Sequence, residues 1–314
     1  MQPSRDLPEP PPIDGTRRRH VVARAIDFHV TESGPEDGRP VLLLHGWPQH
    51  HYAYRHLLAD PPEGLRLIAP DLPGYGWSGP PPHRWEKEEV ASDLLALLDE
   101  IGVSRGLLVG HDWGGWIGFL MTLREPERFE GFLALNIPHP WNTFRTAAPH
   151  MWRFALYQPL MAIFGVALMR RTRFVERLAL RRGSTVDGAI TPADARIFGE
   201  AFRDPVGARA ARDTYRTFLL RELPKQGRRP EPRRGLVPTR VLFGVDDMAV
   251  RPELAAPETA NAEDYALERV SGCGHFIAEE RPDLVRERLL SLASEGAGTS
   301  GARGASAGLS RDPG

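Results

Sequence analysis

Short apolar runs alternate with helical patterns at both ends of the chain. The runs have the length of buried strands, except the first, which alternates polar and apolar side chains like an edge hairpin. They are residues 21–30, 41–44, 65–69, 107–110, 131–137, 239–243 and 265–270. Helical spacing of apolar side chains predicts helices over residues 86–101, 116–123, 252–262 and 282–292. Strands that alternate with helices form mostly parallel sheets with helices on both faces, so the predicted class is α/β.

The middle of the chain lacks this alternation. Residues 141–235 contain only aromatic-rich helical stretches, with 19 Lys and Arg against 8 Asp and Glu, although the whole chain has a net charge of −1. We predict an inserted helical cap over residues 141–235, and a core made of residues 16–140 and 236–294. The near-neutral net charge gives no global argument for binding nucleic acid.

One stretch of the cap, residues 151–169, is apolar enough to be weighed as a membrane span. Arg153, Gln158 and Pro159 fall inside it, which favours a lid helix over an apolar pocket. Arg170, Arg171 and Arg173 follow directly, and contact of this basic cap with an anionic membrane surface is a hypothesis.

Both ends of the chain are predicted to be disordered tails. Residues 1–15 are rich in proline and acidic residues and lack the apolar region of a secretory signal, while residues 295–314 are mostly glycine, alanine and serine. The single cysteine, Cys273, excludes an internal disulfide and is compatible with a reducing compartment, so a cytoplasmic location is expected.

A polar residue flanked by glycines follows the apolar run at 107–110. The order strand, sharp turn, helix in Gly110-His-Asp-Trp-Gly-Gly is typical of a nucleophile elbow, which exposes its central side chain at the carboxyl end of a sheet. Serine occupies that place in the motif G-x-S-x-G, whereas this chain has Asp112. A carboxylate there can attack an alkyl carbon and form an ester on the enzyme. The alternative is that Asp112 only caps the following helix.

Two further chemical groups follow predicted strands. Asp246 and Asp247 follow the strand at 239–243, and His275 follows the strand at 265–270. The carboxyl ends of parallel strands meet at one edge of the sheet, so these groups are expected near Asp112. The order nucleophile, acid, histidine is that of the hydrolase fold, and the spacing from Gly244 favours Asp247 as the acid.

Backbone N–H groups complete the predicted site. The turn His45-Gly-Trp-Pro suggests that the amide of Trp47 points beyond the sheet, so the amides of Trp47 and Trp113 are the predicted oxyanion hole. His45, His50 and His51 lie close together, but no carboxylate or cysteine joins them at ligand spacing in the sequence. We therefore predict no metal site and no organic cofactor.

These motifs resemble the α/β-hydrolase-fold epoxide hydrolases, to which the haloalkane and haloacetate dehalogenases are related. The resemblance runs from about residue 21 to 292. It depends on the segments at 45–48, 110–115, 136–140, 244–247 and 274–276. It implies the α/β-hydrolase fold, and two cap tyrosines that hold the epoxide oxygen. Tyr157-Gln158 and Tyr215-Arg216 match their sequence contexts.

The resemblance and the residue chemistry together imply an epoxide hydrolase. Asp112 would open the epoxide to an ester, and water activated by His275 would release a vicinal diol. The expected partners are a small lipophilic epoxide and water. Aromatic residues of the cap favour an apolar tunnel for such a substrate; they are Trp152, Phe154, Phe164 and Phe174.

Other functions stay open at this point. A haloalkane dehalogenase shares the Asp nucleophile but needs side-chain N–H donors for the halide; Trp113 is one such donor, whereas position 47 has Trp and not the Asn of one dehalogenase group. Haloacetate dehalogenases usually carry Arg after the nucleophile. A non-catalytic ligand-binding protein of this fold is free to lose a triad residue, and this chain retains all three.

Overall fold

A single eight-stranded sheet forms the centre of the molecule. The computed structural model describes residues 7–228, 231–256 and 261–305. The strands are β1 (Arg17–Ala23), β2 (Ile26–Ser33), β3 (Arg39–Leu44), β4 (Leu65–Pro70), β5 (Gly106–His111), β6 (Phe129–Leu135), β7 (Thr239–Gly244) and β8 (Tyr265–Val270). Their order is β1-β2-β4-β3-β5-β6-β7-β8, and every pair from β4 onward is parallel. The single edge strand expected over residues 21–30 is instead a hairpin of β1 and β2, which pair antiparallel around a turn at Arg24 and Ala25.

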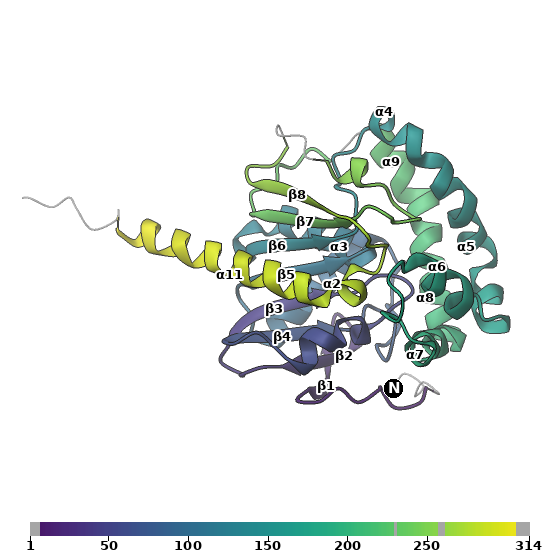
Figure 1. The fold of residues 1–314 in the computed structure, drawn as a ribbon, viewed down its shortest axis with the longest axis horizontal. Helices are drawn as coiled ribbons and strands as arrows, with labels where there is room; N and C mark the ends of the chain where they lie inside the picture. The colour runs from purple at the N-terminus through teal and green to yellow at the C-terminus, as the bar shows by residue number, and fades with distance from the viewer. Residues whose placement is uncertain (1–6, 229–230, 257–260, 306–314) are drawn as a thin grey trace, which may run out of the picture.

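Helices cover both faces of this sheet, as the alternating pattern predicts. The helices α2 (Lys87–Glu100) and α3 (Trp113–Arg124) lie behind the sheet in Figure 1, and α11 (Pro282–Ala305) crosses in front of it. Two short helices, α1 (Arg55–Ala59) and α10 (Ile277–Glu280), complete this part. A Cβ on Gly131 would lie 2.7 Å from Leu292, so a glycine in β6 lets α11 pack closely.

Between β6 and β7 the described residues form helices and one isolated β-bridge, from Gly235 to Ala262. The helices are α4 (Phe144–Ala147), α5 (Met151–Arg171), α6 (Arg181–Gly183), α7 (Pro192–Arg203), α8 (Pro205–Thr217) and α9 (Leu223–Arg228). Two π-helical turns, Val175–Leu180 and Phe218–Glu222, join them. These helices gather at one edge of the sheet (Figure 1) and share one continuous apolar core with it. None of the described helices is long and apolar enough to cross a membrane.

The structure differs from the sequence expectations in three segments. The helix expected over residues 252–262 is only a 3-10 turn, Pro252–Ala255, because Pro257 forces Ala256 into an extended conformation; residues 257–260 lie outside the described part. Helix α11 continues to Ala305, past the expected end at residue 292. Residues 7–15, expected to be a tail, contact the core: Ile13 is buried, and Trp77 Nε1 donates a hydrogen bond to the carbonyl of Pro8 at 2.8 Å.

Candidate active site

The nucleophile candidate Asp112 occupies the turn between β5 and α3. Its backbone has φ 49° and ψ −123°, a left-handed conformation that non-glycine residues adopt only under strain. Its side chain makes no capping bond to α3; instead, Oδ2 accepts a hydrogen bond from the Trp47 N–H at 2.9 Å. A Cβ on Gly46 would collide with this side chain, so the turn after β3 requires glycine. The helix-cap interpretation of Asp112 is therefore wrong.

The acid and the histidine meet Asp112 at the same edge of the sheet. His275 Nδ1 lies 2.7 Å from Asp247 Oδ2, and His275 Nε2 lies 3.9 Å from Asp112 Oδ1. The other oxygen of Asp247 accepts hydrogen bonds from the N–H groups of Ala249 (2.7 Å) and Val250 (3.0 Å). The structure thus brings together Asp112, Asp247 and His275, and it places Asp247, the acid favoured over Asp246, beside the imidazole.

For each of these groups, burial and the neighbouring charges shift the pKa in opposite directions. Burial raises the pKa of Asp112 to about 6, although His275 and the amides of Trp113 and Trp47 oppose the shift. Burial alone would lower the pKa of His275, but its pairing with Asp247 and the charge of Asp112 outweigh burial and raise it to about 9. His275 likewise holds the pKa of buried Asp247 below its usual range. At neutral pH the site therefore contains a carboxylate facing an imidazolium.

Asn136 is a site residue whose contribution the sequence analysis missed. It follows β6 with φ 46°, and its Nδ2 donates to Asp247 Oδ2 at 2.8 Å and to the carbonyl of Gly274 at 3.1 Å. Its Oδ1 accepts from the Gly244 N–H at 3.2 Å. One amide therefore holds the acid and the turns that carry both Asp247 and His275. A polar residue directly after a buried strand was the available signal in the sequence.

Glu280, in the short helix α10, was also missed. Its carboxylate is buried and accepts hydrogen bonds from the N–H groups of Gly274 (2.9 Å) and Phe276 (3.0 Å), on either side of His275. The same carboxylate accepts from Thr185 and Val186 of the cap. The His275 N–H itself donates to the carbonyl of Gly183 at 2.8 Å. Glu280 thus ties the histidine loop to the cap, and no local sequence pattern indicates such a contact.

A cavity of about 600 Å³ lies between the core and the cap, and both Asp112 and Tyr157 line it. Most of its wall is apolar, and the apolar residues that line it include Trp116, Ile137, Phe218, Leu223, Val250 and Leu254. Of the cap aromatics expected to form a tunnel, none of the three with described side chains lines this cavity. Trp152 and Phe164 are exposed, Phe174 packs against Trp47, and the Phe154 side chain is outside the described part. The substrate space is apolar, but helix α9 and the second π-helical turn make much of it.

The two cap tyrosines lie together beside this cavity. The ring centroids of Tyr157 and Tyr215 are 5.8 Å apart, and the Tyr215 ring also contacts the rings of Trp47 at 5.5 Å and Trp113 at 5.6 Å. Burial, followed by the nearby charge of Asp112, raises the pKa of Tyr157 above its usual value, and burial likewise raises that of Tyr215. Both phenols therefore stay protonated at neutral pH and remain able to donate a hydrogen bond.

Comparison with known proteins agrees with this architecture. Residues 39–282 match the model of the alpha/beta hydrolase fold family. The chain belongs to the alpha/beta hydrolase fold family. Its match covers most of the sheet and the cap, and it includes all three groups of the triad arrangement.

Relatives of this hydrolase have several names. It is 27% identical to AB hydrolase superfamily protein YfhM of Bacillus subtilis, over 88% of this chain and 98% of that protein. It is 27% identical to human Epoxide hydrolase 4, over 94% of this chain and 84% of that protein. It is 29% identical to Haloalkane dehalogenase 2 of Mycobacterium tuberculosis, over 84% of this chain and 90% of that protein.

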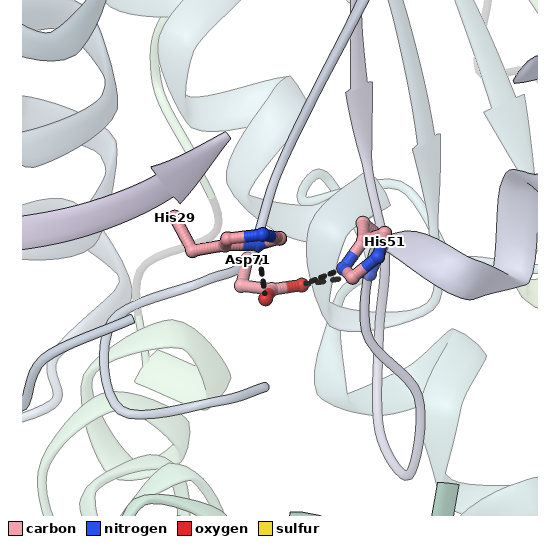
Figure 2. Close-up of side chains that lie close together, drawn as sticks. All are labelled: His29, His51 and Asp71. Atoms are coloured by element: carbon pink, nitrogen blue, oxygen red, sulfur yellow. Dashed lines mark hydrogen bonds and ion pairs between the residues drawn. The ribbon is translucent and has the colours of Figure 1, made fainter. Parts of the chain in front are cut away.

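A second polar cluster in this hydrolase lies under the hairpin strand β2. Figure 2 shows the carboxylate of Asp71 between the imidazoles of His29 and His51, whose Nδ1 atoms lie 3.0 Å and 2.9 Å from it. The sequence analysis expected no carboxylate beside His45, His50 and His51, and for His51 that was wrong. Asp71 is distant in the sequence, but it directly follows β4, which pairs with β2 in the sheet. The backbone N–H groups of His51 (2.8 Å) and Trp77 (2.9 Å) also donate to Asp71.

This cluster fits a hydrogen-bonded anchor better than a metal site. A carboxylate offers about four lone-pair positions, and four N–H donors already fill them on Asp71. Burial would raise the pKa of Asp71, but His51 and His29 outweigh it and hold the pKa well below its usual range. A cation would have to displace two of these donors. The cluster instead fixes the loop after β4 against β2.

Proposed function

We propose that this hydrolase converts a lipophilic epoxide to a vicinal diol in two steps. The observation that carries the proposal is that the carboxylate of Asp112, at a nucleophile elbow, and the protonated phenol of Tyr157 line the same apolar cavity. The relatives named epoxide hydrolase support this choice of substrate class. No metal or organic cofactor is required, because the nucleophile, acid and base are all side chains.

In the first step, Asp112 attacks a ring carbon. Oδ1 or Oδ2 of Asp112 forms a C–O bond while the epoxide C–O bond breaks, and the electron pair goes to the epoxide oxygen. Tyr157 and Tyr215 donate hydrogen bonds to that oxygen, and one phenol supplies the proton that makes it a hydroxyl. A free alkoxide is a poor leaving group in water, so this donation is what makes the ring opening feasible.

In the second step, water hydrolyses the ester. Ester formation removes the negative charge of Asp112, which is one of the causes of the high pKa of His275. The imidazolium can then lose its proton, which restores the phenol that gave up a proton in the first step. The neutral imidazole, oriented by Asp247, accepts a proton from water as the water attacks the ester carbonyl. The amides of Trp47 and Trp113 stabilise the oxyanion, a contribution of about 3 kcal/mol for each donor. Collapse breaks the bond between the carbonyl carbon and the substrate oxygen, which takes the proton held by His275 and leaves as the diol. The Asp112 carboxylic acid then passes its proton to His275, which restores the carboxylate and the imidazolium.

A second candidate reaction, halide displacement from a haloalkane, is favoured by one specific observation. The indole Nε1 atoms of Trp47 and Trp113 are buried; that of Trp47 has no hydrogen-bond partner among the described residues, and that of Trp113 interacts with Tyr215. Such N–H groups can stabilise a departing halide, and one relative is named haloalkane dehalogenase. Both reactions share the ester on Asp112, so they differ only in how the leaving group is stabilised.

One panel of assays tests the proposal and separates the two reactions. We expect diol from styrene oxide or a fatty-acid epoxide and little halide from a haloalkane. Tyr157→Phe should lower diol formation at least 10-fold, because the phenol is required for an alkoxide leaving group and not for a halide. Halide release without any diol would replace epoxide hydrolysis by dehalogenation. Ligand binding by calorimetry without either product would indicate a binding protein.

The covalent intermediate has its own test. Asp112→Asn should abolish turnover, provided that mass spectrometry excludes deamidation back to Asp. His275→Gln should still be alkylated but should not hydrolyse the ester, so intact-mass spectra after exposure to epoxide should show protein plus one substrate. Unmodified protein in that experiment, with Asp112→Asn retaining activity, would eliminate the two-step mechanism.

A further inference from the structure

The outer face of helix α5 is unusual for an exposed helix. With about 100° between successive residues, Trp152, Leu160, Ile163 and Phe164 fall within an arc of about 120°. Their exposed fractions are 58%, 39%, 68% and 56%. The opposite arc carries the buried residues of the helix, among them Gln158, Met161 and Met169, and packs against α8. Helix α5 therefore presents apolar side chains on both faces, and Figure 1 shows it at the outer margin of the cap, away from the sheet.

Arginines border this apolar face. Arg170 and Arg171 end α5 within the same arc, and Arg173, Arg177, Arg181 and Arg182 follow in the next turns of the chain. All six are exposed, and none forms an ion pair with another described residue, although many arginines of the core do. Three of them, Arg173, Arg177 and Arg181, also line a depression of about 650 Å³ in the cap, whose acidic lining residues are Glu176 and Asp187. Glu176 is already paired with Arg203.

We infer that this face, defined by Trp152, Leu160, Ile163, Phe164 and the arginines at 170, 171, 173, 177, 181 and 182, docks on an anionic lipid surface. The apolar side chains insert at the boundary between headgroups and acyl chains, and the arginines bind the anionic headgroups. The unpaired arginines are complementary to anionic headgroups, and the exposed apolar side chains beside them are complementary to acyl chains. A neutral surface would leave the arginines without counter-charges. The depression beside Arg173 can accommodate a headgroup phosphate.

A second copy of this chain is the competing occupant. A two-fold symmetric dimer through α5 would use the same patch on both subunits. It would place the arginines of both subunits in one interface. No acidic cluster on this face offers them partners, since Asp187 is the one acidic group of the adjoining depression without a described ion pair. The charge pattern thus favours lipid over self-association.

Sedimentation with vesicles tests the inference without any substrate. The full chain should bind vesicles that contain phosphatidylglycerol, should bind pure phosphatidylcholine much more weakly, and should be released at high salt, where screening shortens the reach of charge to about 3 Å. Arg170→Gln/Arg171→Gln should weaken binding about 25-fold, since each arginine near such a surface contributes about a five-fold factor. Ile163→Ser/Phe164→Ser should weaken it as well, even at low salt.

Matched substitutions on the core provide the controls. Val22→Ser removes an equally exposed apolar side chain (64%) from β1, and Arg269→Gln removes an exposed arginine from β8; neither should change vesicle binding. Equal binding to neutral and anionic vesicles, or no binding to either, would overturn the inference. A dimer in light scattering that Ile163→Ser/Phe164→Ser dissociates would assign the face to self-association instead. Because these measurements need no turnover, they stand or fall separately from the proposed epoxide chemistry.

Discussion

At the scale of single residues, the site depends on how Asp112 and His275 share charge. Each group raises the stability of the other's charged form, yet burial works against both charges. The charge of Asp112 is therefore one of the causes that keep His275 protonated, after its pairing with Asp247. In the proposed reaction, alkylation of Asp112 would remove that charge, so the same event would prepare His275 to act as a base.

The first step should follow the ionisation of Asp112. Its pKa of about 6 predicts that the alkylation rate falls about ten-fold for each pH unit below that value, because only the carboxylate attacks carbon. Rapid-quench mass spectrometry of His275→Gln, in which the ester persists, measures this step alone. The midpoint in this variant should lie above 6, because the charge of His275, which lowers the pKa of Asp112, is absent. A rate independent of pH through 6 would contradict the assignment. Ester hydrolysis in the native chain should instead rise with pH, with a midpoint below 9, since the charge of Asp112 is then absent.

Asn136 is expected to act through Asp247 and not on the substrate. Asn136→Gly removes the amide while tolerating the positive φ of 46°, so the backbone turn is preserved. Loss of the hydrogen bond to Asp247 should slow ester hydrolysis about 10-fold, as supporting hydrogen bonds at catalytic sites typically do. Alkylation should change little, so the ester should accumulate at steady state. Equal slowing of both steps would indicate a general loss of structure.

At the scale of elements, the cap is attached to the core by a buried lysine. Lys87 begins α2 and is only 1% exposed, yet its side chain forms hydrogen bonds and an ion pair with residues of the cap. Its Nζ donates to the carbonyl of Thr214 at 2.5 Å and lies 3.3 Å from Glu222 Oε2. It also lies 4.6 Å from the ring centroid of Trp113. Thr214 precedes Tyr215, so this lysine joins α2, the end of α8 and the cavity wall at one point.

Removing this contact should loosen the cap. Lys87→Met leaves Glu222 without its cation and should lower the free energy of unfolding by about 2 kcal/mol; we place it below the range for fully buried pairs because Glu222 is partly exposed. Lys87→Met/Glu222→Gln should recover part of the loss, which a double-mutant cycle in urea measures. Lys225→Met is the matched control, since Lys225 is the other lysine of the chain and is exposed on α9. A loss of the same size in the control would contradict a specific role for Lys87.

At the scale of the whole molecule, helix α5 connects the cavity to the outer face of the cap. Tyr157, Gln158 and Pro159 line the cavity, and Leu160 and Ile163 belong to the exposed face one turn further on. If the proposed reaction and the proposed lipid surface are both correct, a substrate dissolved in the bilayer meets the cavity close to its rim. The cavity wall is mostly apolar, as is the bilayer interior from which such a substrate would come.

Anionic vesicles should therefore change the substrate preference. Turnover of an epoxide that partitions into vesicles should be faster for the native chain than for Ile163→Ser/Phe164→Ser, since only the native chain docks. A water-soluble epoxide should be hydrolysed equally by both, because neither substituted residue lines the cavity. Diol assays with and without vesicles measure both cases. Equal rates for the membrane-dissolved epoxide would separate catalysis from docking.

Local sequence patterns were enough to locate the sheet and the elbow. The apolar runs and the glycines around Asp112 specify strand, turn and helix over a few neighbouring residues, and the order of Asp112, Asp247 and His275 predicted that they converge. The pattern failed at residues 252–262, where Pro257 and its effect on the preceding residue mattered more than apolar spacing. It also did not identify the cavity wall: Trp152 and Phe164, which suggested an apolar tunnel, are exposed, because aromatic residues on a helix can face solvent as well as a cavity.

The sequence by itself thus determined the parallel sheet, the inserted helical segment and the identity of the groups at the carboxyl ends of the strands, because each follows from residues adjacent in the chain. Only the tertiary structure decided which distant groups support them. Asn136 reaches Asp247 across 111 positions, Glu280 reaches Thr185 across 95, and Lys87 reaches Thr214 across 127. Such hydrogen bonds depend on how the chain packs in three dimensions, and no local periodicity encodes that packing.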